Sequence, residues 1–153
     1  MRPFGLPTSI ALLGFGGLLP PLALIIAGQI ENPATHSIEF WGVVYGMLIL
    51  TFLGGTWWAF ASRFPPRKLP TGILVLSVLP SLIAFVLLIM LFSFAALSPM
   101  TAGLVVGGLI LGSPLVDAWL ARRRYTPRWW MTLRVPLSIL LGVLVIACGW
   151  LAG

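Results

Sequence analysis

Asp117 is the residue whose type and surroundings most directly suggest chemistry. It is a lone carboxylate in a long apolar stretch, one turn before the end of the helix predicted at 100–121. An aspartate inside a membrane helix is costly and usually has a partner. Asp117 and Arg134 are equally far along the chain from the centre of the connection between their helices. They should therefore face each other in an antiparallel hairpin, and we predict an ion pair between them, with Arg63 as the alternative partner.

The rest of the chain offers few groups for catalysis. His36 and the nearby Glu31 and Glu39 include metal-ligand types, but a solvated loop is the favoured interpretation. Cys148 is the only cysteine, and Lys68, the only lysine, follows no phosphate-binding glycine loop. A proton relay through the ion pair is disfavoured, because a relay needs a chain of titratable groups. We predict no catalytic residue, no metal site, no cofactor and no enzymatic activity.

Membrane-spanning helices must position these side chains. The chain of 153 residues is 59% hydrophobic and 8% charged, whereas soluble domains are about a quarter charged. A bilayer-spanning helix needs about 20 apolar residues, and the uncharged runs occupy 3–30, 40–62, 69–116 and 135–153. Ser98-Pro99 is a turn signal that divides the third run. We predict a single all-α domain over 1–153, an integral membrane bundle of five transmembrane helices at 8–28, 40–61, 71–97, 100–121 and 132–152.

The basic residues predict how this bundle is oriented. All nine lysines and arginines precede the first helix, separate the second from the third, or flank the fourth connection. With five spans these regions lie on one side of the membrane, and the positive side is cytoplasmic. We expect a cytoplasmic N-terminus, an outer C-terminus and a location in the bacterial cytoplasmic (inner) membrane. A cleaved signal peptide is the alternative for the first helix, but its apolar core of about 20 residues exceeds the usual 7 to 15.

Arg122, Arg123 and Arg124 form the densest basic cluster. Together with the net charge of +6 it invites a nucleic-acid interpretation. The positive-inside rule already accounts for these arginines. We therefore predict no nucleic acid as a partner, and we expect the cluster to attract anionic lipid headgroups on the cytoplasmic side.

The tryptophans lie near the predicted membrane margins. Indole rings prefer the interface, so we interpret these residues as anchors. Those near the cytoplasmic ends are Trp57, Trp58, Trp119, Trp129 and Trp130, and those near the outer ends are Trp41 and Trp150. The alternative is a pocket or interface, for which the candidate residues are Gly54, Gly55, Trp57, Trp58, Pro80, Trp129 and Trp130.

Glycines one helical turn apart predict close helix packing. Lipid supplies no hydrophobic drive for helix association, so close backbone approach must substitute. The spaced pairs are Gly42 with Gly46, Gly103 with Gly107, and Gly108 with Gly112. On a helix Gly42, Gly46, Leu53 and Trp57 share one face, which we expect to turn toward the bundle. The fourth helix has either this chain or a second copy as its partner. Kinks are expected at Pro20-Pro21, Pro80 and Pro114.

Several separated motifs, taken together, resemble a known family. They are Phe52-Leu53-Gly54-Gly55 with Trp58, Leu79-Pro80-Ser81-Leu82, Asp117, and Pro127, Trp129, Leu133 and Arg134. The chain resembles the bacterial "domain of unknown function 3429" family, which is related to the animal mitochondrial transmembrane protein 69. Where the family pattern has a histidine, this chain has Trp57. The resemblance implies a five-helix inner-membrane protein and no established activity.

Three function classes follow from these observations. A non-catalytic scaffold, subunit or assembly partner of a membrane complex, or a homo-oligomer, fits the packing glycines and short loops and is favoured. The alternative is a binding protein or carrier for a small lipophilic molecule, and an intramembrane enzyme comes last. A cavity of about 300 Å³ or more near Trp57 would favour the carrier. A solid core with an exposed glycine face would favour the scaffold.

Overall fold

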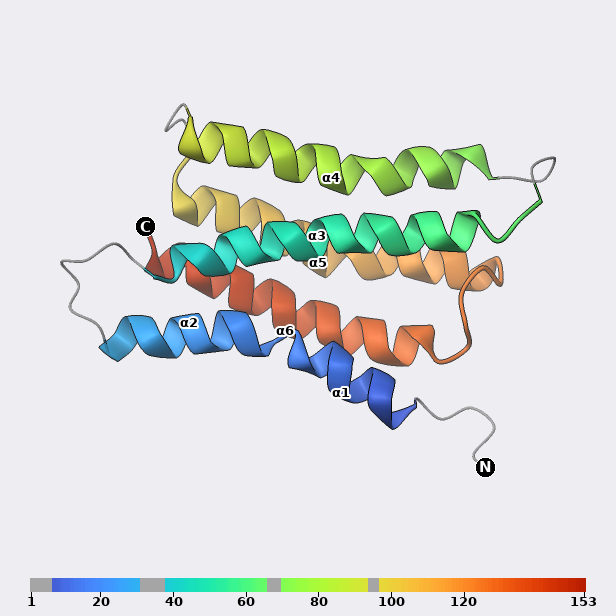
Figure 1. Cartoon of the computed structure of the whole chain (residues 1–153), viewed down its shortest axis with the longest axis horizontal. Coiled ribbons are helices and arrows are strands. Elements are labelled where there is room, and N and C mark those ends of the chain that lie inside the picture. Colours follow the sequence, from blue (N-terminus) through green and yellow to red (C-terminus); the bar gives the residue numbers. More distant parts are fainter. Residues whose placement is uncertain (1–6, 31–37, 66–69, 94–96) are drawn as a thin grey trace.

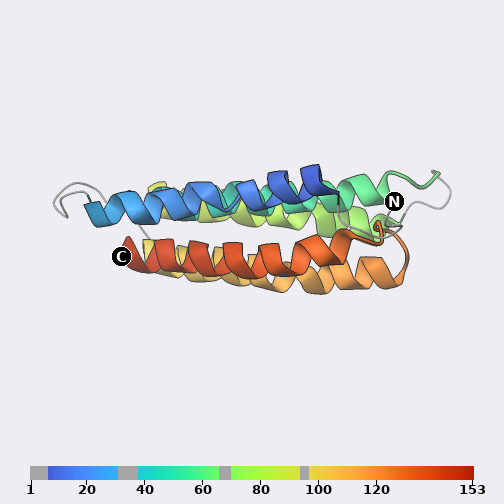
Figure 2. The same ribbon diagram turned by 90° about the horizontal axis from the view of Figure 1, so that it is seen from below.

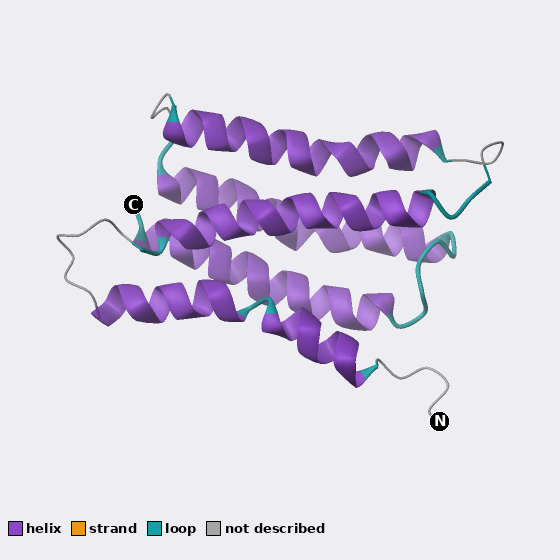
Figure 3. Ribbon diagram, viewed as in Figure 1, coloured by secondary structure: helices purple, strands orange, loops and turns teal. Residues whose placement is uncertain are grey.

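The computed structural model describes residues 7–30, 38–65, 70–93 and 97–153. These residues form helices joined by turns and contain no strand (Figure 3). Within them, the first span together with α3–α6 supplies five segments long and apolar enough to cross a membrane. The all-α architecture is confirmed, and the chain is a multi-pass membrane protein. The helices are α1 (Thr8–Gly16), α2 (Leu19–Ile30), α3 (Phe40–Ala61), α4 (Thr71–Phe92), α5 (Pro99–Arg122) and α6 (Trp130–Leu151).

The first span is broken into two helices next to Pro20-Pro21, where a kink was predicted, so the predicted helix over 8–28 is not continuous. The chain leaves the helix after Gly16 and starts a new one at Leu19. The physical reason is Pro20-Pro21, since prolines are tolerated in a first helical turn, where the backbone N–H groups have no intrahelical partner. The Tyr45 hydroxyl of α3 donates to the carbonyl of Gly17, 2.9 Å away, and so satisfies a backbone group at the break.

The other spans largely match their predicted limits. α4 ends at Phe92 rather than at 97, and residues 94–96 of that prediction lie outside the described part. α4 and α5 continue through Pro80 and Pro114 as single helices. Pro114 leaves the carbonyl of Ile110 without its helical donor, and the Ser113 hydroxyl donates to that carbonyl at 2.8 Å. This bond allows α5 to pass the proline inside the membrane.

The helices form two layers. Figure 2 shows α1, α2, α3 and α4 side by side in one layer and α5 and α6 in the other. The closest pairings are α5 with α6 and α3 with α4. A methyl group on Gly103 would lie 2.8 Å from Cα of Gly149, and one on Gly107 would lie 2.7 Å from the Gly142 carbonyl oxygen. The predicted Gly103–Gly107 face is therefore a packing face, and α6 of the same chain covers it.

The buried side of α3 is the one predicted. Gly42, Gly46, Leu53 and Trp57 are all buried. Gly42 and Gly46 admit Cys148 and Val145 of α6, while Gly54 lies against the backbone of α4 at Ser77. α3 thus touches both layers and forms the centre of the bundle.

Gly108 and Gly112 have no packing partner among the described helices of this chain. A methyl group on either would meet no atom of the described residues within 4 Å. They face away from α6, because α6 covers the opposite stripe of α5, the one that carries Gly103 and Gly107. α1 is also loosely attached. Among the described helices, only α6 makes more than marginal contact with it. α1 also diverges from α2 at the break (Figure 1).

Candidate functional site

Asp117 lies at the centre of a buried polar cluster at the basic end of the bundle. Its side chain is fully buried, and Nε of Arg134 lies 2.8 Å from its Oδ2 atom. Its Oδ1 atom accepts hydrogen bonds from the indole N–H groups of Trp57 and Trp130, each at 3.0 Å. Three helices, α3, α5 and α6, therefore meet on one carboxylate. We call these residues, with Ser113 and Ser138, the Asp117 cluster.

Two serines complete the cluster on the side away from the indoles. Nη2 of Arg134 donates to the Ser113 hydroxyl at 2.8 Å. The Ser113 hydroxyl itself donates its proton to the Ile110 carbonyl oxygen. A hydroxyl has only one proton to donate, so Ser138, whose Oγ lies 3.4 Å from that of Ser113, must be the donor in their contact. Among the described residues, no side-chain nitrogen or oxygen closed off from solvent lacks a hydrogen-bond partner.

The cluster is electrically neutral and holds the helices together. Arg134 is 4% exposed, so its charge depends on Asp117 for compensation. Breaking such a pair by removing one partner costs about 3–5 kcal/mol, because the other charge stays buried. Trp130 adds packing to the same point: its ring meets Phe60 edge-on with centroids 5.0 Å apart, and the guanidinium carbon of Arg134 lies 5.8 Å from the Trp130 ring centroid.

The predicted ion pair is thus present, while its alternative partner is elsewhere. Arg63 is exposed beyond the end of α3 and makes no ion pair with Asp117. The interpretation of Trp57 as an interfacial anchor is wrong, since this side chain is only 5% exposed. Its indole can be buried because Asp117 accepts its N–H. The signal was available in the shared face of Trp57 with Gly42, Gly46 and Leu53, although the carboxylate partner was not.

Trp58, unlike Trp57, is exposed as a membrane-interface anchor should be. It follows Trp57 on α3 and is 50% exposed, as expected for a ring at the bilayer margin. Trp41 and Trp150, at the opposite end of the bundle, are also more than half exposed. Adjacent tryptophans on one helix therefore have opposite roles, because consecutive positions point about 100° apart.

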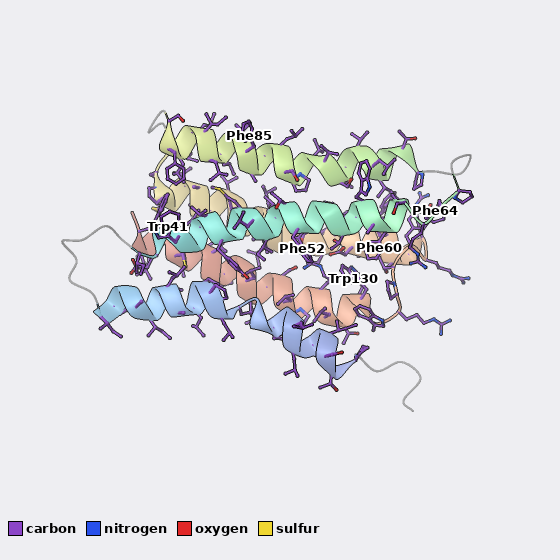
Figure 4. All side chains as sticks on the ribbon, in the orientation of Figure 1. Trp41, Phe52, Phe60, Phe64, Phe85 and Trp130 are labelled. Atoms are coloured by element: carbon purple, nitrogen blue, oxygen red, sulfur yellow. The ribbon has the colours of Figure 1, made fainter. Side chains whose placement is uncertain are left out.

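An apolar cavity of about 350 Å³ lies on one side of the cluster. We call it the α1 cavity, because α1 forms one wall and α3 and α6 form the others. Figure 4 labels Phe52 and Trp130, which belong to the α3 and α6 walls. The polar side chains at its wall are Thr56, Trp130 and Arg134.

A second hollow of about 330 Å³ lies on the other side of the cluster, between α3, α4 and α5. We call it the α4–α5 groove. Trp57 and Ser113 of the Asp117 cluster border it, and so do Pro80, Gly108 and Gly112. The glycines leave the groove open, since neither would bring a methyl group within 4 Å of another element. The cluster therefore forms a polar partition between two apolar spaces.

The residues predicted as a pocket or interface are divided by the structure. Trp57 and Pro80 line the α4–α5 groove, and Trp130 lines the α1 cavity. Gly54 is buried in the α3–α4 contact instead. The remaining three, Gly55, Trp58 and Trp129, border neither space.

The other sequence candidates lie away from this site. Arg122, Arg123 and Arg124 are exposed at the end of α5, where the Arg123 guanidinium carbon lies 4.9 Å from the Trp119 ring centroid. His36 and Glu31 fall outside the described residues. Glu39 is buried against Gly28 at the opposite end of the bundle. Among the residues placed by the structure, no group of three histidine, cysteine or acidic side chains could hold a metal ion.

The family model described as "Protein of unknown function (DUF3429)" matches residues 6–150. The chain belongs to the DUF3429 family. The matched range contains the whole Asp117 cluster and every residue that lines the α1 cavity or the α4–α5 groove. Searches of the curated proteins and of the solved structures found no match to this DUF3429 protein.

Proposed function

We propose that this DUF3429 protein binds a small lipophilic molecule in the α1 cavity and has no catalytic role. The observation that carries the proposal is an apolar space of about 350 Å³ that is bordered by Trp130 and Arg134 of the Asp117 cluster. Ligand pockets occupy about 300–1,000 Å³ and combine apolar walls with a few placed polar groups. The α1 cavity has this composition.

The loose packing of α1 supports entry from the bilayer. The first span has a much smaller buried fraction than the other four, and its apolar side chains, Leu12 and Leu13 among them, are largely exposed. A helix with few buried contacts opens at a low free-energy cost. A molecule dissolved in the acyl chains could therefore reach the cavity by displacement of α1, without passing through water.

A matched pair of substitutions on α6 tests this function. Leu137 lines the α1 cavity, whereas Val143 on the same helix is 55% exposed and faces outward. Dodecane added to the purified protein should raise the melting temperature, because a ligand that binds the folded state stabilises it. Leu137→Trp should abolish that rise and Val143→Trp should preserve it. No rise for the unaltered protein, or an equal rise in both variants, would refute binding at this cavity.

A scaffold role is the second candidate, and the open glycines of the α4–α5 groove favour it. Gly108 and Gly112 are spaced as in a helix-packing face, yet no described helix covers them. A transmembrane helix of a partner protein would be the occupant. Gly108→Leu should then remove a protein that co-purifies in mild detergent, while Leu115→Ala, at an exposed α5 position, should retain it. Identical co-purification from both variants would exclude this surface.

We also propose a bacterial inner-membrane location with a cytoplasmic N-terminus. Arg63, after α3, and the arginines from 122 to 128, at the end of α5 and in the connection to α6, lie at the same end of the bundle, which supports this orientation. A reporter enzyme fused after Gly153 should lie on the periplasmic side of the membrane, and its activity should be detected there. Activity in the cytoplasm would reverse the orientation.

A further inference from the structure

We propose that the α1 cavity selects a single-chain lipophile with an uncharged carbonyl group, which accepts a hydrogen bond from Arg134. This inference rests on the proposed binding function and specifies its ligand. The hydrogen-bond donors at the cavity wall determine which ligand fits, because an apolar space gains chemical selectivity only from the few polar atoms that reach it.

Two of the three polar side chains at the wall have already used their protons. The Thr56 hydroxyl donates to the Leu53 carbonyl at 2.7 Å. The Trp130 indole donates to Asp117 at 3.0 Å. Neither group retains a proton for a ligand.

Arg134 retains donor capacity. Its Nε and Nη2 atoms bind Asp117 and Ser113, while Nη1 makes no hydrogen bond within the described residues. Every described side-chain nitrogen that is closed off from solvent does have a partner, so Nη1 must reach accessible space. Arg134 is one of the residues that line the α1 cavity. We take the α1 cavity to be the space that Nη1 reaches, where it would offer an N–H group to a ligand among apolar walls.

The charge balance of the Asp117–Arg134 pair determines which ligand group the Arg134 N–H can bind. Asp117 already compensates Arg134, so the pair has no net positive charge to offer a second anion. An added carboxylate would remain uncompensated in an apolar space, which is strongly unfavourable. A carbonyl oxygen accepts the N–H without bringing a charge. The apolar walls of α1, α3 and α6 then accommodate the hydrocarbon chain.

Three probes of the same chain length test this selectivity in delipidated protein in maltoside micelles. They are dodecane, methyl laurate and laurate at a pH at which it is ionised, and dissociation constants come from thermal stabilisation. One hydrogen bond to a charged donor should make methyl laurate bind about tenfold more tightly than dodecane. Laurate should bind more weakly than methyl laurate. Equal affinity for dodecane and methyl laurate, or tighter binding of laurate, would overturn the inference.

A paired substitution separates the donor from the fold. Asp117→Asn with Arg134→Gln removes both charges and shortens the side chain at 134, while amide groups can still bind each other and the indoles. This variant should lose the tenfold preference for methyl laurate over dodecane. A preserved preference would exclude Arg134 as the donor. Absence of any dodecane binding to the unaltered protein would refute the proposed function itself.

A bilayer phospholipid and a free lipophile are the two sources of such a carbonyl. Phosphatidylcholine added to the complex with methyl laurate distinguishes them. Displacement would assign the site to the acyl ester of a two-chain bilayer lipid and would overturn the single-chain part of the inference, whereas retention supports a free single-chain molecule. Carbonyl recognition itself is decided by the affinity ratio of the three probes.

Discussion

Replacement of Asp117 by leucine should destabilise the bundle mainly through the charge that it leaves behind. Arg134 is 4% exposed and would remain buried without its counter-ion, at a cost of about 3–5 kcal/mol. The indoles of Trp57 and Trp130 would also lose their acceptor. Hydrogen bonds between membrane helices average about 0.6 kcal/mol each, so these two add about 1 kcal/mol. We expect a total loss of about 4–6 kcal/mol, most of it from the guanidinium.

The double variant Asp117→Leu with Arg134→Met supplies the decisive comparison. An apolar pair of similar volume often replaces a buried ion pair without loss of stability. The double variant should therefore lose only the hydrogen bonds to Trp57, Trp130 and Ser113, about 2 kcal/mol in all. Equilibrium unfolding by sodium dodecyl sulfate in mixed micelles measures the free energy of each variant. If the double variant is no more stable than Asp117→Leu alone, the loss arises from packing and the reasoning from charge is wrong.

Three further predictions follow from the helix contacts and the basic end. Gly103→Ala should lower stability by about 1–3 kcal/mol through overpacking, since its methyl group would lie 2.8 Å from Cα of Gly149. Gly108→Ala should be neutral or stabilising, because its methyl group would meet no described neighbour. Equal melting temperatures of the two variants would contradict the assigned faces. Trp57→Phe should lower the unfolding free energy more than Trp57→His, because histidine keeps an N–H for Asp117; the reverse order would exclude the hydrogen bond as the reason. Glutamine at all three of Arg122, Arg123 and Arg124 should weaken association with anionic liposomes at an unchanged melting temperature, and unaltered association would exclude this cluster as the headgroup site.

Some of the site was predictable because its residues are neighbours in a hairpin. The Asp117–Arg134 pair followed from equal distances to one connection, and antiparallel helices of similar rise bring such positions to the same depth. The Gly103–Gly107 face was predictable as a packing face by spacing alone. The spacing of Gly108 with Gly112 is identical, yet no described helix packs on that pair. Spacing identifies a stripe able to pack, while the placement of the neighbouring helices decides which stripe does.

The sequence by itself determined the helical class and the five membrane-spanning segments, because the transfer of an apolar segment into lipid depends on its own composition. It also indicated the break in the first span through Pro20-Pro21. Only the tertiary structure decided that Trp57 is buried on a carboxylate 60 positions away while Trp58 remains exposed. The α1 cavity belongs to the same category. Its volume depends on how closely α1, α3 and α6 approach, which is a property of three separate segments and of no single one.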